Sequence, residues 1–265
     1  MKTIKIDDPK HLIQEINQLP QHFIFRGQAD KDWRLESSLE RTLADNWTQE
    51  NVEKHEKRSI SNFKSKFHLY DSENTIPDSG FAWLSIMQHY GVPTRLLDFT
   101  ESPYVALYFA IESYTGQKPR KPFALFALDY REIMKRSVDH IRSKDKEFDE
   151  TQTSVFEKSD QIFDSVVNRF SYDVLWVAEP KVMNARLDRQ SGTFLISGNR
   201  AVRIEAVLNS NLYSDIVAYK FEIDGSLYEN IYALLRKMNI NSKSIYGNLE
   251  GLARSIKMEM QVYSA

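Results

Sequence analysis

The most informative part of the chain is the stretch QHYGVPTRLLDFTESPYVALYFAIE, residues 88–112. Its segment PTRLLDFT predicts a buried strand, and SPYVALYFAIESY predicts a buried helix with Ser102 as N-cap and Pro103 in the first turn. Arg95 and Asp98 lie inside this otherwise apolar pattern. Charged side chains are seldom buried alone, because the loss of hydration costs several kcal/mol per ion. Each of the two residues is therefore expected to have a partner in the fold or in a ligand.

The two charged residues are not expected to pair with each other. Alternate side chains of a strand point to opposite faces, so Arg95 and Asp98 lie on different faces. Asp98 stands just before the helix N-terminus at Ser102, where free backbone N–H groups favour negative charge. Such a corner is also a ready phosphate site. Two interpretations stay open here: the pair holds the corner together, or it forms the rim of a pocket.

The other predicted elements alternate between strands and helices. We expect one α/β (α+β) domain over residues 1–265, with a central mixed β-sheet, surrounding helices and a helical insertion near the front. A charged stretch at 131–160 predicts a solvated helix and a mobile loop. Strands are expected at 22–27, 93–100, 122–129, 174–180, 192–197, 207–210 and 216–223, and helices at 7–20, 48–70, 81–91, 102–114, 226–240 and 249–260.

Composition narrows the function classes. The chain has 42% hydrophobic and 27% charged residues, as ordinary globular proteins do, and a net charge of −2 gives no overall basic field for nucleic acid. Without cysteine there is no disulfide, thiol nucleophile or cysteine-bound metal, and the six histidines show no paired ligand spacing. No apolar run approaches the roughly 18 residues of a membrane span. We expect a cytoplasmic protein without a metal and without membrane contact.

The segment HFIFRG places an arginine at the end of a short strand. Phe23 and Phe25 share one face of this strand, and Ile24 and Arg26 share the other. Gly27 then lets the backbone turn or lets a neighbour approach closely. The guanidinium fork suits a carboxylate or a phosphate, and a structural pair of Arg26 with an aspartate is the alternative.

A third segment, RLDRQSGTFLIS, carries an amide at the mouth of a predicted strand. Gln190, Gly192, Phe194 and Ile196 would share one strand face, with Gln190 at its open end. The amide there orients a polar ligand, or it satisfies only the loop backbone.

Together these three places resemble the FRG domain family, a prokaryotic family named for its Phe-Arg-Gly motif, here Phe25-Arg26-Gly27. The family signature QHYGxPTRLLDWTxSPxxALYFA is matched from Gln88 to Ala110, with Phe99 in place of the usual tryptophan. The resemblance covers about residues 10–255. Its further motifs are RxxxQxGxF at Arg186, Gln190, Gly192 and Phe194, and LxGLA at Leu249 to Ala253.

The resemblance implies a role in phage defence or a toxin system, and the three motif strands look like those of ADP-ribosyltransferases. It implies that Arg26 holds the pyrophosphate of NAD, and that Thr94 and Asp98 shape the pocket. Gln190 would stand where an acidic residue is usual. An amide neither acts as a base nor stabilises a cation as a carboxylate does, so activity would depend on Asp98 or Glu179, or be lost.

The candidate catalytic residues are thus Arg26, Asp98 and Gln190. NAD is expected as substrate if the transferase interpretation holds, and no metal is expected. The candidate substrate- or cofactor-binding residues are Phe25, Gly27, Gln28, His89, Thr94, Arg95 and Arg186.

Three functions remain open at this point. The first is an ADP-ribosyltransferase-like transferase or NAD hydrolase. The second is a non-catalytic sensor or partner-binding module of a defence system, with a protein partner and with structural motif residues. The third is an RNA-acting toxin, for which Arg186, Arg189, Arg200 and Arg203 supply a modest basic cluster.

Overall fold

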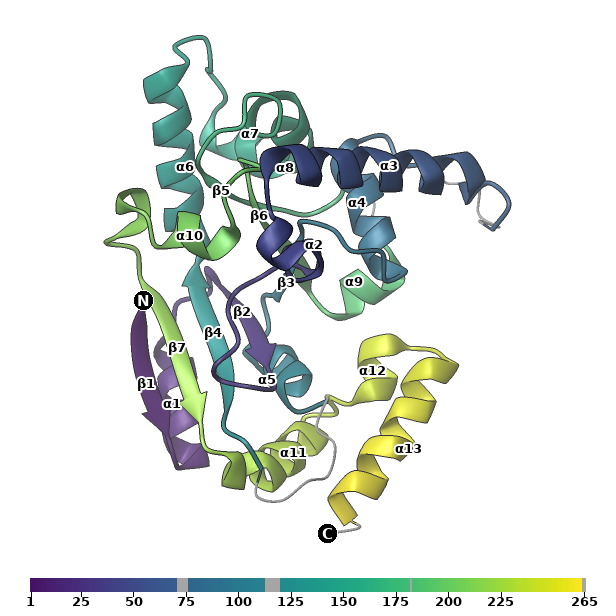
Figure 1. Cartoon of the computed structure of the whole chain (residues 1–265). Helices are drawn as coiled ribbons and strands as arrows, with labels where there is room; N and C mark the ends of the chain where they lie inside the picture. The colour runs from purple at the N-terminus through teal and green to yellow at the C-terminus, as the bar shows by residue number, and fades with distance from the viewer. Residues whose placement is uncertain (71–75, 113–119, 182, 264–265) are drawn as a thin grey trace.

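A seven-stranded mixed sheet forms the centre of the molecule (Figure 1). The computed structural model describes residues 1–70, 76–112, 120–181 and 183–263. The strand order is β1-β7-β4-β2-β3-β6-β5, with β1 parallel to β7 and the other neighbours antiparallel. The prediction of an α/β fold with a mixed sheet is therefore confirmed. The strands are β1 (Lys2–Ile6), β2 (Phe23–Gln28), β3 (Leu97–Thr100), β4 (Phe123–Asp129), β5 (Leu175–Ala178), β6 (Gly192–Ser197) and β7 (Ala218–Ile223).

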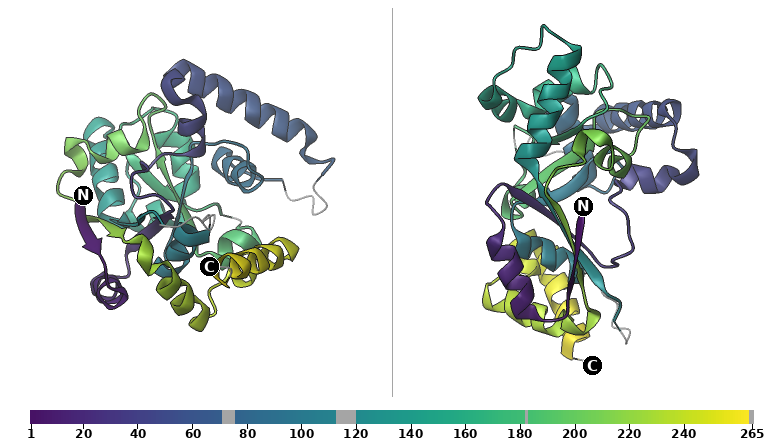
Figure 2. Two further views of the ribbon diagram at one scale, coloured as in Figure 1. Left: turned by 60° about the horizontal axis from the view of Figure 1, so that its bottom comes forward. Right: turned by 90° about the vertical axis from the view of Figure 1, so that its left-hand side faces the viewer.

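Helices cover both faces of the sheet (Figure 2). One hydrophobic cluster joins it to α1, α5 and α11, and the other joins it to α4, α6, α8 and α10. The helices are α1 (Pro9–Gln18), α2 (Ser38–Leu43), α3 (Gln49–Phe67), α4 (Gly80–His89), α5 (Pro103–Glu112), α6 (Tyr130–Lys144), α7 (Gln152–Glu157), α8 (Ser159–Ile162), α9 (Ala185–Arg189), α10 (Ile204–Leu208), α11 (Tyr228–Lys237), α12 (Ser242–Tyr246) and α13 (Leu249–Tyr263). None of these described helices has the length and apolar character of a membrane span.

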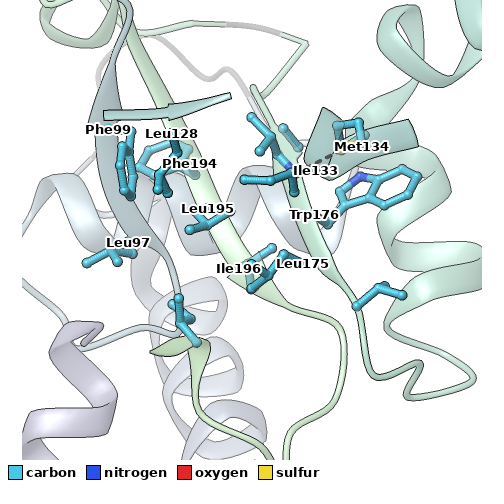
Figure 3. Close-up of a cluster of buried hydrophobic side chains, with 14 of the residues drawn as sticks. Leu97, Phe99, Leu128, Ile133, Met134, Leu175, Trp176, Phe194, Leu195 and Ile196 are labelled. Atoms are coloured by element: carbon cyan, nitrogen blue, oxygen red, sulfur yellow. Dashed lines mark hydrogen bonds between the residues drawn. The ribbon is translucent and has the colours of Figure 1, made fainter. Parts of the chain in front are cut away.

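The second cluster is centred on β3, β6 and β5. In Figure 3, Leu97 and Phe99 of β3 lie on the side of Phe194 and Leu195 of β6. Ile133 and Met134 of α6 lie near Trp176 of β5. Trp176 of β5 is fully buried, and its indole N–H donates to the carbonyl of Ser159 at 2.8 Å. Strands β5 and β6 are apolar on consecutive residues, as expected for strands buried on both faces, whereas β3 carries the exposed Asp98.

The sheet opens between β2 and β3. Strand β2 pairs with β4 along its whole length, from Phe23 to Gln28, and β3 pairs with β6 from Leu97 to Thr100. Within the described sheet, β2 and β3 pair at a single position, Phe25 with Thr100. Backbone groups on both sides of this opening are thus left outside the regular ladder, where a side chain or a ligand must satisfy them.

The glycine of the motif is required by close packing. A Cβ atom at Gly27 would lie 1.8 Å from the carbonyl oxygen of Ala106, on α5. The two possibilities at this position, a turn or a close approach, are thereby resolved in favour of close approach. The predicted alternation is also confirmed, since Phe23 and Phe25 belong to the α5 cluster and Ile24 to the opposite one.

Several predicted elements differ from the structure. The strand expected at 93–100 begins at Leu97, and the helix expected at 102–114 is described as far as Glu112, because residues 113 and 114 lie outside the described part. The segment expected as a strand at 207–210 is instead the end of α10 and the turn after it, and Ile204, Val207 and Leu208 bury one face of this helix. Strand β1 was not predicted.

Gln190 is not on a strand. It is the C-cap of α9, and β6 begins only at Gly192, after Ser191 with a φ of 43°. The expectation that Gln190 continues the strand face of Gly192 and Phe194 is therefore wrong. The left-handed backbone of Ser191 turns the chain between helix and strand. The alternation of side chains along the sequence does not reveal such a turn.

Candidate functional site

A cavity of about 690 Å³ lies where β2 and β3 separate. Its wall combines residues of β2, β3, α4, α5, α9 and α12 with the segment 29–36. This volume is within the usual range for small-molecule and cofactor sites. Eight of the ten candidate residues line it: Phe25, Arg26, Gly27, Gln28, His89, Asp98, Arg186 and Gln190.

Arg26 spans the opening of the sheet. Its NH1 donates to the main-chain oxygen of Asp98 at 2.7 Å and lies 3.9 Å from the carboxylate Oδ2 of the same residue. Burial lowers the pKa of Arg26 and Asp98 opposes this shift, but arginine remains a cation in proteins. Its Nε–H is buried and has no acceptor among the described residues. One nitrogen of the guanidinium is thus used by the fold, and the buried Nε–H has no partner among the described residues.

Asp98 is the most accessible carboxylate beside Arg26. Its side chain is 62% exposed. Oδ1 accepts a hydrogen bond of 2.8 Å from the amide of Gln88, on α4. The hydroxyl of Thr94 in turn donates to the Gln88 carbonyl oxygen, and this contact fixes which way the amide points. A chain of contacts from Thr94 through Gln88 thereby orients Asp98.

The contacts from Thr94 through Gln88 correct the predicted role of Thr94 and add Gln88 to the residues of the site. Thr94 is 1% exposed and does not line the cavity, contrary to the prediction that it binds a ligand directly. Its hydroxyl acts on the site through Gln88, which lines the cavity. Gln88 is the first letter of the matched signature, so the motif itself pointed to it, although strand periodicity did not.

Arg95 lies in the interior, away from the cavity. It is 2% exposed, and its Nε donates to Glu56 at 2.9 Å, on α3. Its other nitrogens donate to Ser197 O at 2.9 Å and to Asn168 Oδ1 at 2.7 Å. Burial raises the pKa of Glu56, but the neighbouring guanidinium groups of Arg95 and Arg200 outweigh it, so the net shift is downward. Contrary to the expectation of a ligand-facing role, Arg95 holds the inserted helix α3 on the sheet.

Gln190 and Arg186 form the wall opposite β2. The main-chain oxygen of Gln190 accepts from the Thr100 hydroxyl at 2.6 Å, and its amide Nε2 is buried with no acceptor in the described part of the chain. The guanidinium of Arg186 lies over the ring of Tyr246, 4.7 Å from its centroid. Burial lowers the pKa of His89, and the charge of Arg186 lowers it further, which favours the neutral imidazole.

A polar cluster at the edge of the cavity joins α5 to the C-terminal helices. Glu112 accepts from the Tyr246 hydroxyl at 2.7 and 2.8 Å, from Tyr108 at 3.1 Å and from Arg254 at 2.8 Å. Glu112 and Tyr246 both line the cavity. No motif in the sequence singled out Tyr246. With its oxygens occupied by these donors, Glu112 serves to hold α12 in place.

Glu179 belongs to a different site. It lines a second cavity, of about 560 Å³, and none of the residues lining that cavity also lines the first. Burial raises the pKa of Glu179 to about 7, and Glu101 contributes to the same shift. Glu179 therefore does not accompany Arg26, and Asp98 is the remaining acidic candidate of the two expected.

The four arginines of the expected basic cluster are divided between two places. Arg200 donates to Glu56 at 3.0 Å, and Arg203 donates to Glu36 at 3.2 Å. Arg186 and Arg189 instead contact Tyr246, on α12. Most of this charge is therefore used within the fold. Likewise, no group of three metal-binding side chains occurs across residues 1–70, 76–112, 120–181 and 183–263.

Residues 21–118 match the family model described as FRG domain. The chain thus carries an FRG domain, as the motif at Phe25 to Gly27 and the signature from Gln88 predicted. The match includes β2, β3 and α5, and so both sides of the opening in the sheet. No curated protein and no solved structure matches the chain significantly.

Proposed function

We propose that this FRG-domain chain binds a phosphate-bearing nucleotide in the cavity between β2 and β3 and uses NAD as its substrate. The observation that carries the proposal is Arg26, whose guanidinium is held at the opening of the sheet with its Nε–H unpaired. A buried donor of this kind favours an anionic ligand, and a guanidinium binds phosphate oxygens well. Arg34, Arg41 and Arg186 line the same cavity and add positive charge.

The proposed reaction is transfer of ADP-ribose. The bond between the nicotinamide nitrogen and C1′ of the ribose breaks, and nicotinamide leaves as a neutral molecule with the bonding electron pair. Positive charge develops on the ribose. A nucleophile, either water or a group on a target, then attacks C1′ and loses a proton.

Each cavity residue has a role in this proposal. Arg26 holds the pyrophosphate, and Asp98, oriented by Gln88, stabilises the positive charge on the ribose by its own negative charge. Gln190 donates from its amide to a ribose hydroxyl. These assignments follow the resemblance to ADP-ribosyltransferases, with Asp98 in place of the late acidic residue at whose usual position Gln190 stands.

Labelled NAD tests the proposal directly. The wild-type protein is expected to consume NAD and release nicotinamide, and Arg26→Ala and Asp98→Asn are expected to slow this at least about a hundredfold. Arg58→Ala is the control, because Arg58 is exposed on α3 and does not line the cavity. If the wild-type protein neither consumes NAD nor shows a thermal shift with it, the proposal is wrong.

A second function is favoured by one contact. Arg26 donates to the main-chain oxygen of Asp98, which is a structural use of the guanidinium. This contact supports a non-catalytic sensor or partner-binding module, with a protein partner from a defence or toxin system, a setting that rests on the family resemblance. In that case NAD has no effect, and Arg26→Ala acts through stability alone. Phage plaque counts with wild type and with Arg26→Lys, together with melting curves, separate the two functions.

A further inference from the structure

We propose that Gln28 is a specificity-determining residue of the cavity and that it requires an N–H donor on the ligand, such as the carboxamide of NAD. This inference rests on the proposed function. It concerns the nicotinamide end of the ligand, and it distinguishes an amide from the corresponding carboxylic acid.

The orientation of the Gln28 amide is fixed by the backbone. Gln28 is 5% exposed and is the last residue of β2. Its Nε2 donates to the main-chain oxygen of Arg34 at 3.0 Å. A carbonyl oxygen only accepts, so the NH₂ end of the amide must face Arg34. The acceptor Oε1, at the other end of the amide, therefore points away from the Arg34 carbonyl oxygen.

This acceptor has no donor within the described part of the chain. Oε1 of Gln28 is buried and unpaired, and the side chain lines the cavity. The large majority of buried side-chain oxygens in proteins accept a hydrogen bond, because an unpaired oxygen loses its hydration without compensation. An acceptor kept in this state beside a cavity is expected to find its partner on a ligand.

Arg26 and Gln28 form a donor–acceptor pair on one strand face. They are two residues apart on β2, so their side chains point the same way, roughly 7 Å apart along the strand. Arg26 offers the unpaired Nε–H, and Gln28 offers the unpaired Oε1. Across the opening, Gln190 offers an unpaired amide N–H. The complementary ligand carries acceptors for Arg26 and Gln190 and a donor for Gln28, and a primary carboxamide next to phosphate has this pattern.

Trp33 and Arg34 line the same cavity as Gln28. The indole of Trp33 is 56% exposed, and the side chain of Arg34 is exposed as well. A carboxylate in place of the carboxamide would have no hydrogen to offer and would bring negative charge against the lone pairs of Oε1. We therefore expect the acid to be rejected.

Calorimetric titration with three ligands tests this: NAD, its nicotinic acid counterpart, in which a carboxylate replaces the carboxamide, and ADP-ribose, which lacks the pyridine ring. The wild-type protein is expected to bind NAD at least about tenfold tighter than the acid. Gln28→Met retains the side-chain length without the amide and is expected to bring the two affinities within about threefold. Binding of ADP-ribose by this variant is expected to stay within about twofold of wild type. Gln14→Met, at an exposed position of α1, is the control, and melting curves confirm that each variant is folded.

The outcomes separate this inference from the proposed function. Equal wild-type affinity for NAD and its acid overturns the role of Gln28 and leaves nucleotide binding standing. A folded Gln28→Met variant that still rejects the acid also overturns it. If none of the three ligands binds the wild-type protein, the proposed function fails and this inference fails with it.

Discussion

At the level of single residues, Arg26 and Asp98 do two things at once. A single hydrogen bond of 2.7 Å from Arg26 to the Asp98 carbonyl crosses the gap that the backbone ladder leaves between β2 and β3. The Asp98 carboxylate itself remains 62% exposed and faces the cavity. The sequence suggested two interpretations, residues that hold the strand–helix corner together and residues at the rim of a pocket. Both therefore apply to Arg26 and Asp98.

Loss of the Arg26 guanidinium is expected to lower stability modestly. Arg26→Ala removes one charge-assisted hydrogen bond, so we expect the free energy of unfolding to fall by about 1.5–3 kcal/mol. Urea denaturation measures this difference, with Arg58→Ala as the control. A fall of less than about 0.5 kcal/mol would mean that the contact to Asp98 does not hold the two parts of the sheet together.

The contact chain from Thr94 through Gln88 is expected to be energetically coupled. Thr94→Val removes the hydroxyl that fixes the Gln88 amide, and Gln88→Leu removes the donor to Asp98. We expect a double-mutant cycle on nicotinamide release to give a coupling energy of about 0.5–3 kcal/mol. Thr42→Val, on an exposed position of α2, is the control. Additive effects of the two substitutions would show that Thr94 does not act on the site through Gln88.

The sequence revealed which residues are unusual more reliably than what each one does. Arg95 and Asp98 stand three positions apart in one motif, yet Arg95 is 2% exposed and Asp98 lines the cavity. The difference depends on Glu56, 39 positions before Arg95, whose carboxylate receives the guanidinium. No local pattern contains that partner, so periodicity alone did not assign Arg95 to the interior.

At the level of secondary-structure elements, the contact of α5 with β2 determines the shape of one cavity wall. The backbone of α5 crosses Gly27 so closely that no side chain fits, and Ala106 and Phe109 of the same helix line the cavity. The position of the wall therefore depends on the absence of a Cβ atom at Gly27. Gly27 allows this close approach and does not serve to turn the backbone.

Gly27→Ala is expected to be strongly destabilising. Its Cβ would lie 1.8 Å from the Ala106 carbonyl oxygen, which is backbone and cannot turn aside. The helix must shift, so we expect a loss of about 3 kcal/mol or more, at the upper end for overpacking. Denaturation curves measure this loss. Gly91→Ala is the comparison, because it has open space around it and a φ of 81°, and so tests backbone strain without a clash. A smaller loss for Gly27→Ala than for Gly91→Ala would contradict the account.

The ion pair that fixes α3 is expected to contribute to the stability of the fold but not to the affinity for NAD. Arg95→Met leaves Glu56 buried with only Arg200 as a charged partner, and removal of one member of a buried pair costs about 3 kcal/mol. We expect a lower melting temperature with an unchanged affinity for NAD in the variant that remains folded. A large loss of affinity for NAD in Arg95→Met at unchanged stability would show that Arg95 belongs to the ligand site.

Elements with a strong pattern were predictable, and short connections were not. The helix from Thr48 and the apolar strand from Pro122 were found because their patterns are long and consistent. The short helix α10 and the turn at Gln190 were missed, because five residues contain too little periodicity. In both cases tertiary contacts decide: the N–H of Ile204 donates to Glu40 at 2.8 Å, and the Thr100 hydroxyl donates to the main-chain oxygen of Gln190 at 2.6 Å.

At the level of the whole molecule, the site exists because the sheet opens in its middle. The composition and alternating elements predicted a mixed sheet with helices around it, which the structure confirms. The order β4-β2-β3-β6, and the single pairing between β2 and β3, follow from registers among strands far apart in the sequence. That is why the sequence indicated the residues of the site but not the gap that brings them together.

The contribution of Glu179 to the stability of the fold is expected to fall as pH rises from about 4.5 to 7. The pKa of Glu179 is raised to about 7 in the folded protein from an ordinary value of 4.5, so the folded state holds more protons than the unfolded state over this interval. Glu179→Gln is expected to flatten this part of the pH dependence. Melting curves at several pH values measure it, with the exposed Glu157→Gln as control. A wild-type profile that rises steadily to pH 7, unaltered by Glu179→Gln, would contradict the prediction.

The most direct test of the central claim is a structure of the protein with NAD or a non-hydrolysable analogue of it bound. The account predicts the pyrophosphate in the cavity between β2 and β3, with a phosphate oxygen at hydrogen-bond distance, about 3 Å, from the Arg26 guanidinium. A dinucleotide seated in the second cavity beside Glu179, or one in the first cavity with no phosphate contact to Arg26, would contradict it.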